Sequence, residues 1–119
     1  MPFVIGNLYY IRCSYIVPPH EKISICVCDK TPYFIWVSTN AKFHGIAQIL
    51  LRAGITDGII HDSYADLSDL KMASPRDLAT ARDFGPISAN VRALILAEYQ
   101  NPVRTLPEQR RQMLLANLA

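Results

Sequence analysis

The sequence predicts an α+β domain, with β-strands in the first half of the chain and helices in the second half. Up to about residue 62, short runs of β-branched and aromatic residues alternate with Gly, Pro, Asn and Asp, which is typical of strands joined by turns. From about residue 74, apolar residues recur at three- and four-residue spacing behind residues that cap helices. Strands followed by helices indicate the α+β class, with strands in about 3–62 and helices in about 74–118.

Length and composition predict one domain over residues 1–119. Half of the residues are apolar and 18% are charged, with a net charge of +2, which is typical of a chain with a packed core. Residues 1–52 carry five basic and two acidic side chains. This weak excess of positive charge is compatible with a nucleic-acid partner but does not require one.

The cysteines and the hydropathy pattern indicate a soluble, cytoplasmic protein. Cys13, Cys26 and Cys28 are an odd number, and the last two share one face of an expected strand, so we expect buried thiols rather than disulfides or a zinc site. The N-terminus has no signal-peptide pattern, and no run approaches the roughly 20 apolar residues of a membrane span. No membrane association is expected.

The expected strands lie at residues 8–11, 23–28, 33–37, 46–51 and 59–61. Asp29 to Pro32 forms a short turn, so the second and third strands make a hairpin. Pro18 and Pro19 place residues 18–22 in a loop, because proline lacks an N–H and fixes φ. The run 46–51 is short enough to be a strand or a turn and a half of helix, and we favour the strand.

The first two expected helices have clear start and stop signals. Ser74 caps a short helix that has Pro75 in its first turn, and Gly85 ends it. Pro86 prevents its continuation. Ser88 caps the second helix, which runs to the Asn-Pro pair at 101–102.

The third expected helix begins at Thr105 and Glu108, which have the spacing of a capping box. Together the second and third helices carry two apolar stripes, formed by Val91, Leu94, Ile95 and Tyr99 and by Met113, Leu114 and Leu118. One face of a small sheet does not readily cover two such stripes. We therefore expect a homodimer whose contact uses barrel residues and one apolar helix face.

The candidate site combines the end of the strand at 33–37 with the loop at 18–22. Strand ends hold side chains in fixed positions, and loops at those ends carry function. The chemistry-bearing residues are His20, Glu21, Lys22, Ser38, Thr39 and Asn40. The structural alternative is that the loop is a solvated turn and that the hydroxyls only satisfy backbone groups at the strand end.

The order of these signals resembles the PemK/MazF family of toxin endoribonucleases over roughly residues 3–100. The matching features are Gly-x-Leu-Tyr-Tyr-Ile at 6–11, the buried strand at 23–28, the Ser-Thr pair at 38–39, the stretch at 59–67, the segment at 85–88, and Val91 and Leu94. The resemblance implies a small SH3-like β-barrel with C-terminal helices, usually a homodimer. It also implies a metal-independent endoribonuclease that cuts single-stranded RNA and is neutralised by an antitoxin peptide.

The chain departs from the family pattern at two places. The family's opening strand usually has Gly-Asp where this chain has Gly6-Asn7, and the family's loop arginine is absent, since no arginine lies between Arg12 and Arg52. The hydroxyl of the family's catalytic pair carries over to Ser38 or Thr39, and the arginine has no counterpart.

Cleavage of RNA by its own 2′-hydroxyl needs a base, an acid and positive charge on the phosphate. His20 and Lys22 can supply the acid or base and the cation, Ser38 or Thr39 a hydrogen bond to phosphate, and we expect Glu21 and Asn40 to contact substrate. The histidines lack metal-ligand spacing, so no metal and no cofactor is expected. The alternative is a catalytically inactive barrel of the same ancestry that binds a protein or a nucleic acid.

Overall fold

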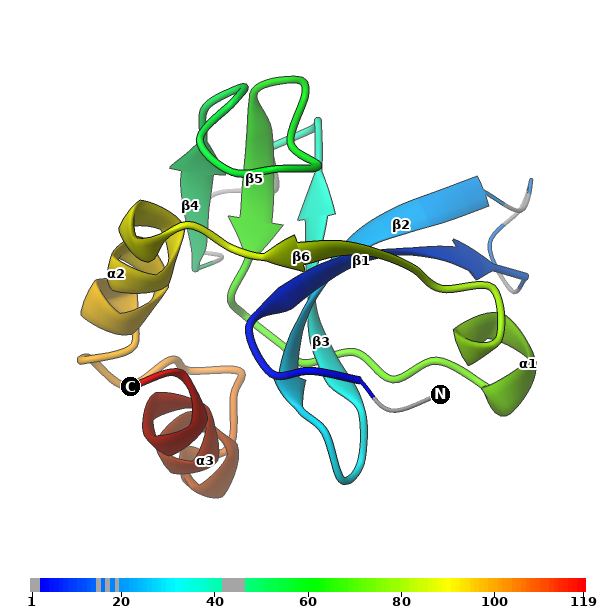
Figure 1. The fold of residues 1–119 in the computed structure, drawn as a ribbon. Helices are drawn as coiled ribbons and strands as arrows, with labels where there is room; N and C mark the ends of the chain where they lie inside the picture. The colour runs from blue at the N-terminus through cyan, green and yellow to red at the C-terminus, as the bar shows by residue number, and fades with distance from the viewer. Residues whose placement is uncertain (1–2, 15, 17, 19, 42–46) are drawn as a thin grey trace.

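An antiparallel sheet of six strands, with three helices around it, makes up the α+β fold of the described residues in the computed structural model (Figure 1). The described residues are 3–14, 16, 18, 20–41 and 47–119. The strands are β1 (Asn7–Cys13), β2 (His20–Cys28), β3 (Tyr33–Ser38), β4 (Gln48–Leu51), β5 (Ser63–Asp66) and β6 (Arg82–Pro86). The helices are α1 (Pro75–Leu78), α2 (Ala89–Glu98) and α3 (Glu108–Leu118).

The strands are ordered β4-β5-β3-β2-β1-β6. Among the described residues the two edge strands, β4 and β6, do not pair with each other, so the sheet is not closed. Figure 1 shows β4, β5 and the end of β3 running across the direction of β1, β2 and β6, with α2 and α3 together on one side and α1 on the other. Beyond Ile23 and Val37, the last pair between them, β2 lies beside β1 alone and β3 lies beside β5, so the start of β2 and the end of β3 diverge.

Each face of the sheet carries its own apolar cluster, because successive side chains of a strand point to opposite faces. On one face, Leu8, Ile25 and Ile35 occupy matching positions on three neighbouring strands and pack in the main core with α2 and α3. On the other face, Tyr9 and Phe34 pack with Phe3, their ring centroids 4.9 to 6.4 Å apart. Both faces of the central strands are thus buried, as the apolar run at 23–28 indicated.

Most of the expected strands are confirmed, with different bounds. The strands at 8–11, 23–28 and 33–37 lie within β1, β2 and β3. The run at 46–51, for which strand and helix were both considered, contains the strand β4, although residue 46 lies outside the described residues. The loop expected over residues 18–22 is wrong for residues 20–22, which extend β2 by pairing with β1. The strand expected at 59–61 is also wrong, because the last strand of this region is β5.

The helix expected between Ser74 and Gly85 is largely wrong. Ser74 does cap α1, accepting a hydrogen bond from the Asp77 N–H at 3.1 Å, but α1 ends at Leu78. The chain then returns as β6, which adds an edge strand to β1. Gly85, with φ +85°, lies at an irregularity of that pairing, where β6 has one residue more than β1. Gly-Pro marks a β-bulge on an edge strand here, not a helix end.

Of the caps expected for the two later helices, the one at α2 is confirmed and the one at α3 is wrong. Ser88 caps α2 by accepting a hydrogen bond from the Val91 N–H at 3.3 Å. The capping box at Thr105 is wrong, because α3 begins after Pro107 without a side-chain cap. The Thr105 hydroxyl donates to the Ser68 carbonyl instead, and Glu108 pairs with Arg111.

The two apolar stripes are covered within one chain. Val91, Ile95, Tyr99, Leu114 and Leu118 are buried in the main core, and Leu94 is the exposed member at 41%. The reason given for a homodimer, two stripes with no cover, therefore does not hold, and the dimer itself stays a prediction. Cys13 and Cys26 are buried as expected, whereas Cys28 is only half-buried. Burial raises the pKa of the Cys26 thiol to about 11. None of the helices among the described residues is long and apolar enough to cross a membrane.

Candidate functional site

A hollow of about 500 Å³ lies between the start of β2 and the end of β3. It is lined by His20, Glu21, Lys22, Ile23, Val37, Ser38, Thr39, Asn40 and Ala41. The structure therefore brings together all six side chains that the sequence singled out. The hairpin explains this, because the last backbone pair is Ile23 with Val37 and both segments continue beyond it.

The side chains that line the hollow come from both faces of the sheet, because successive side chains of a strand point to opposite faces. Ile23 and Val37 pack against the main core, so their neighbours Lys22 and Ser38 belong to the opposite face of the sheet. Lys22 and Ser38 come from adjacent strands on that face, where an ammonium and a hydroxyl can contact one phosphate together. Glu21 comes from the same face as Ile23, so the hollow receives side chains from both faces at its rim.

His20 is exposed and its ring is oriented by the backbone. Its Nδ1 lies 3.0 Å from the carbonyl oxygen of Pro18. A carbonyl can only accept, so this hydrogen bond requires the proton on Nδ1. The neutral ring then carries its lone pair on Nε2, which is the form that can accept a proton.

The Ser38 hydroxyl stabilises the backbone and can also bind a ligand. The Asn40 N–H donates to Ser38 Oγ at 3.2 Å, which stabilises the turn after β3. The Ser38 hydroxyl hydrogen is not used in that bond, so it can still donate to a ligand. Thr39 and Asn40 are exposed.

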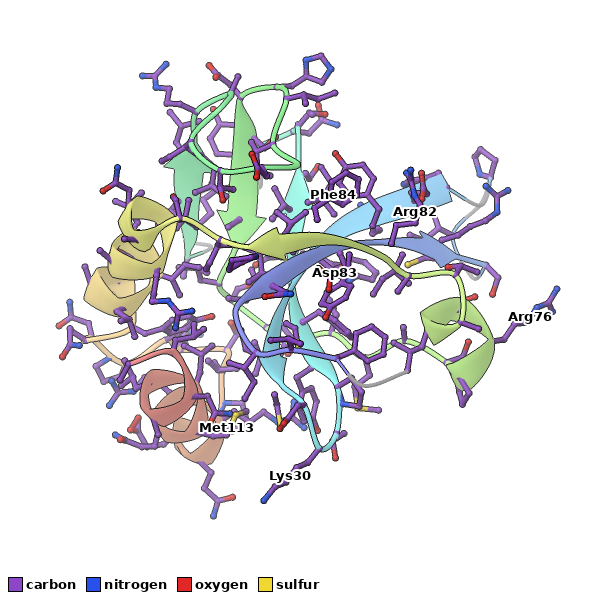
Figure 2. All side chains as sticks on the ribbon, in the orientation of Figure 1. Lys30, Arg76, Arg82, Asp83, Phe84 and Met113 are labelled. Atoms are coloured by element: carbon purple, nitrogen blue, oxygen red, sulfur yellow. The ribbon has the colours of Figure 1, made fainter. Side chains whose placement is uncertain are left out.

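Sequence reasoning missed Arg82, which pairs with Glu21 at the hollow but is not one of its lining residues. Its Nη2 lies 2.7 Å from Glu21 Oε1 and its Nε donates to Oε2 at 3.0 Å, a two-point ion pair between β6 and β2. Figure 2 shows Arg82 beside β2. The guanidinium carbon also lies 5.3 Å from the centroid of the Tyr10 ring and 5.6 Å from that of Phe84. The sequence predicts a helix at Arg82, and the one local signal for the edge strand β6 is Gly-Pro at 85–86, a pair that also suits such a strand.

A second, larger hollow of about 820 Å³ lies between the segment at 68–71 and the region around the end of α2. Its charged lining residues are Asp69, Lys71, Glu98 and Arg104. Two acidic and two basic side chains leave it without a preference for an anion or a cation. The smaller hollow combines an imidazole, a cation and hydroxyls, so we regard it as the candidate site.

Within the described part of the chain, no group of three or more His, Cys, Asp or Glu side chains is arranged to hold a metal ion. No protein-family model matches the chain, and no curated protein shows significant sequence similarity to it. The PemK/MazF resemblance therefore stays a hypothesis, and only the geometry of the site bears on the function of the chain.

Proposed function

We propose that the chain is a PemK/MazF-like toxin with an SH3-like barrel, a cytoplasmic endoribonuclease that cleaves single-stranded RNA without a metal ion. One observation supports this above the others: an imidazole, an ammonium and hydroxyls line one exposed hollow at the end of a hairpin. These are the groups that cleavage by a 2′-hydroxyl needs. The homodimer and an antitoxin peptide as partner are implied by the family resemblance and are part of the proposal.

The reaction assigns one role to each group. His20 Nε2 takes the proton of the ribose 2′-hydroxyl, and the 2′-oxygen attacks the adjacent phosphorus. The bond from phosphorus to the 5′-oxygen breaks, and that oxygen takes a proton from the Lys22 ammonium. The products are a 2′,3′-cyclic phosphate and a 5′-hydroxyl. Ser38 and Thr39 donate hydrogen bonds to the phosphate oxygens as their negative charge rises.

Arg82 offers the guanidinium that the loop lacks. Arg82 pairs with Glu21, a residue that lines the hollow, and an incoming phosphate can compete with that carboxylate for the same fork of N–H donors. The ion pair is exposed, with 58% of the Arg82 side chain and 38% of the Glu21 side chain accessible, so exchanging its partner costs little.

Incubation of the purified chain with a panel of mixed-sequence single-stranded RNAs in excess EDTA tests the proposal. We expect cleavage that leaves cyclic phosphate ends, and loss of cleavage in Lys22→Ala. Lys30→Ala is the matched control, because Lys30 lies in the turn at the other end of the β2–β3 hairpin (Figure 2). Failure to cut any RNA of the panel, or activity that EDTA removes and Mg²⁺ restores, contradicts the proposal.

A second candidate function is a catalytically inactive module that binds nucleic acid or protein through the same hollow. The observation that favours it is the Glu21–Arg82 pair, which neutralises the guanidinium in the unbound chain. Such a module binds RNA without cutting it, and its induced expression does not arrest growth.

A further inference from the structure

Trp36 is contacted by two lysines from different segments. Lys22 Nζ on β2 lies 5.2 Å from the centroid of the Trp36 ring, and Lys71 Nζ lies 5.4 Å from it. Both distances are typical of a cation held by an aromatic ring. The ring is half-buried, so part of it reaches the surface between two positive charges.

The backbone fixes this arrangement. Phe34 and Lys71 form a bridge in which each N–H donates to the other's carbonyl at 2.8 Å, so the segment of Lys71 lies along β3 two residues from Trp36. The pair of Ser24 with Trp36 sets the register on the other side and places Lys22 diagonally across from the ring. Asp69 Oδ2 lies 3.5 Å from Lys71 Nζ and limits where that side chain moves.

An aromatic ring between two lysines suits a single-stranded nucleic acid. A base stacks on the ring, and the phosphates on each side of the nucleotide meet the ammonium groups. Exposed contacts between a cation and a ring are weak, so the lysines can leave the ring for phosphate when a base takes their place. The carboxylates of an acidic peptide can pair with the two lysines, but they do not stack on the Trp36 ring.

We propose that Trp36 stacks a base next to the nucleotide held in the hollow, with Lys22 and Lys71 binding the phosphates on its two sides. Lys22 joins the two positions, because it both lines the hollow and contacts the ring. The placement relative to the cut bond rests on the proposed function, whereas the binding itself does not. Lys71 also lines the larger hollow.

The chain has a single tryptophan and six tyrosines, so fluorescence excited at wavelengths that tyrosine does not absorb reports on Trp36 alone. We expect a 2′-O-methyl RNA octamer, which cannot be cleaved, to quench this fluorescence as it binds. Lys71→Ala should weaken binding of a labelled octamer about 5- to 10-fold and lower the slope of log K against log salt by about 0.7, the value for one phosphate contact on a single strand. Lys30→Ala, far along the hairpin, should change neither.

Substitution of the ring separates stacking from charge. Trp36→Leu should weaken binding of the labelled octamer by about 5- to 100-fold, the loss of one stacked base, and Trp36→Phe should restore most of it. An octamer that is abasic throughout should bind poorly and leave the fluorescence unchanged. Equal binding of the abasic octamer or of polyglutamate, or unaltered binding by Lys71→Ala, overturns the inference.

The two proposals fail in different ways. A chain that cuts RNA while Lys71→Ala and Trp36→Leu bind it normally retains the proposed function and loses the stacking site. A chain that cuts no RNA but shows base-dependent quenching of Trp36 retains the stacking site and loses the proposed function.

Discussion

Arg82 and Glu21 form a two-point ion pair that ties the edge strand β6 to the start of β2, across 61 residues of sequence. The same guanidinium packs over Tyr10 and Phe84, so three contacts hold one exposed cation in one place. Because Glu21 lines the hollow between β2 and β3, the pair sets the charge at its rim.

Arg82→Ala should therefore lower RNA cleavage without unfolding the chain. Loss of a cation that contacts phosphate costs on the order of 10- to 1000-fold in kcat/KM, whereas loss of an exposed ion pair costs about 0.5 kcal/mol or less in free energy of unfolding. Arg82→Lys should recover part of the loss, because an ammonium keeps the charge but not the fork. Cleavage rates and thermal unfolding measure the two effects.

Arg76→Ala is the control for this prediction, since Arg76 lies exposed on α1, away from the hollow (Figure 2). Equal cleavage by wild type and Arg82→Ala means that the ion pair is only structural. A loss of several kcal/mol in the unfolding free energy would instead show that β6 depends on it.

The hollow was predictable from the sequence and Arg82 was not, for a physical reason. Once the turn at 29–32 fixes the hairpin, residues at equal distance from it come near each other, which brings 20–22 and 38–40 to the two sides of one hollow, although the backbone pairing stops at Ile23 and Val37. Arg82 arrives through the pairing of β6 with β1, two segments more than 60 residues apart. Such a long-range pairing leaves no pattern in the local sequence, whereas the capping residues at Ser74 favour a helix there.

Thr39→Ala should lower cleavage on the order of 10- to 1000-fold, the effect of losing one hydrogen bond to the developing charge. The unfolding free energy should change by less than about 0.5 kcal/mol, because Thr39 is exposed at the end of β3 and its truncation leaves no cavity. Thr31→Ala in the β2–β3 turn removes an equally exposed hydroxyl and should leave cleavage unchanged. If Thr39→Ala is as active as Thr31→Ala, Ser38 alone supplies the hydroxyl.

His20→Ala should slow cleavage, because it removes the Nε2 lone pair that takes the proton of the 2′-hydroxyl. His61→Ala, which removes another exposed imidazole, should keep the wild-type rate. Cleavage by His20→Ala at the rate of His61→Ala would assign the base to another group.

The local sequence also misplaced the last strand of the β region. Ile59 and Ile60 favour a strand, but the Ile59 carbonyl accepts from the Gly54 N–H at 2.7 Å and the Ile59 N–H donates to Thr56. These bonds within one loop use the groups that a strand would need. The strand that forms instead, β5, has few β-favouring residues, and its pairing on both sides with β3 and β4 decides its structure.

Gly58→Ala should destabilise the fold more than Gly54→Ala. Both glycines have positive φ, +93° and +82°, so each alanine carries the same backbone strain of about 1–2 kcal/mol. A Cβ at Gly58 would lie 2.7 Å from Cδ2 of the fully buried Leu8, whereas nothing lies within 4 Å of one at Gly54. The extra cost should be about 1–3 kcal/mol in denaturant unfolding, as for overpacked cores. Equal losses would mean that Leu8 can move aside.

Glu108 should make the fold less stable in acid. Arg111 donates to its carboxylate at 2.7 to 3.2 Å and Gln112 at 3.0 Å, and these hydrogen bonds lower the pKa of Glu108 to about 2. A carboxyl whose pKa is lower in the folded chain than in the unfolded chain stabilises the fold above its ordinary pKa near 4.5. That contribution is lost as the pH falls from about 5 towards about 2.

Glu108→Gln removes the charge and keeps the shape, so its Tm should lie below that of wild type at pH 7 and approach it at pH 2 to 3. Arg111 also donates to the Tyr99 carbonyl at 2.6 Å and so joins α3 to the end of α2. In an Arg111→Met background, which keeps the packed stem of the side chain, the effect of Glu108→Gln on Tm should depend much less on pH, because only the hydrogen bond from Gln112 still lowers the pKa of Glu108. A wild-type advantage over Glu108→Gln that is the same at pH 3 and pH 7 would show that Arg111 does not lower the pKa of this carboxyl.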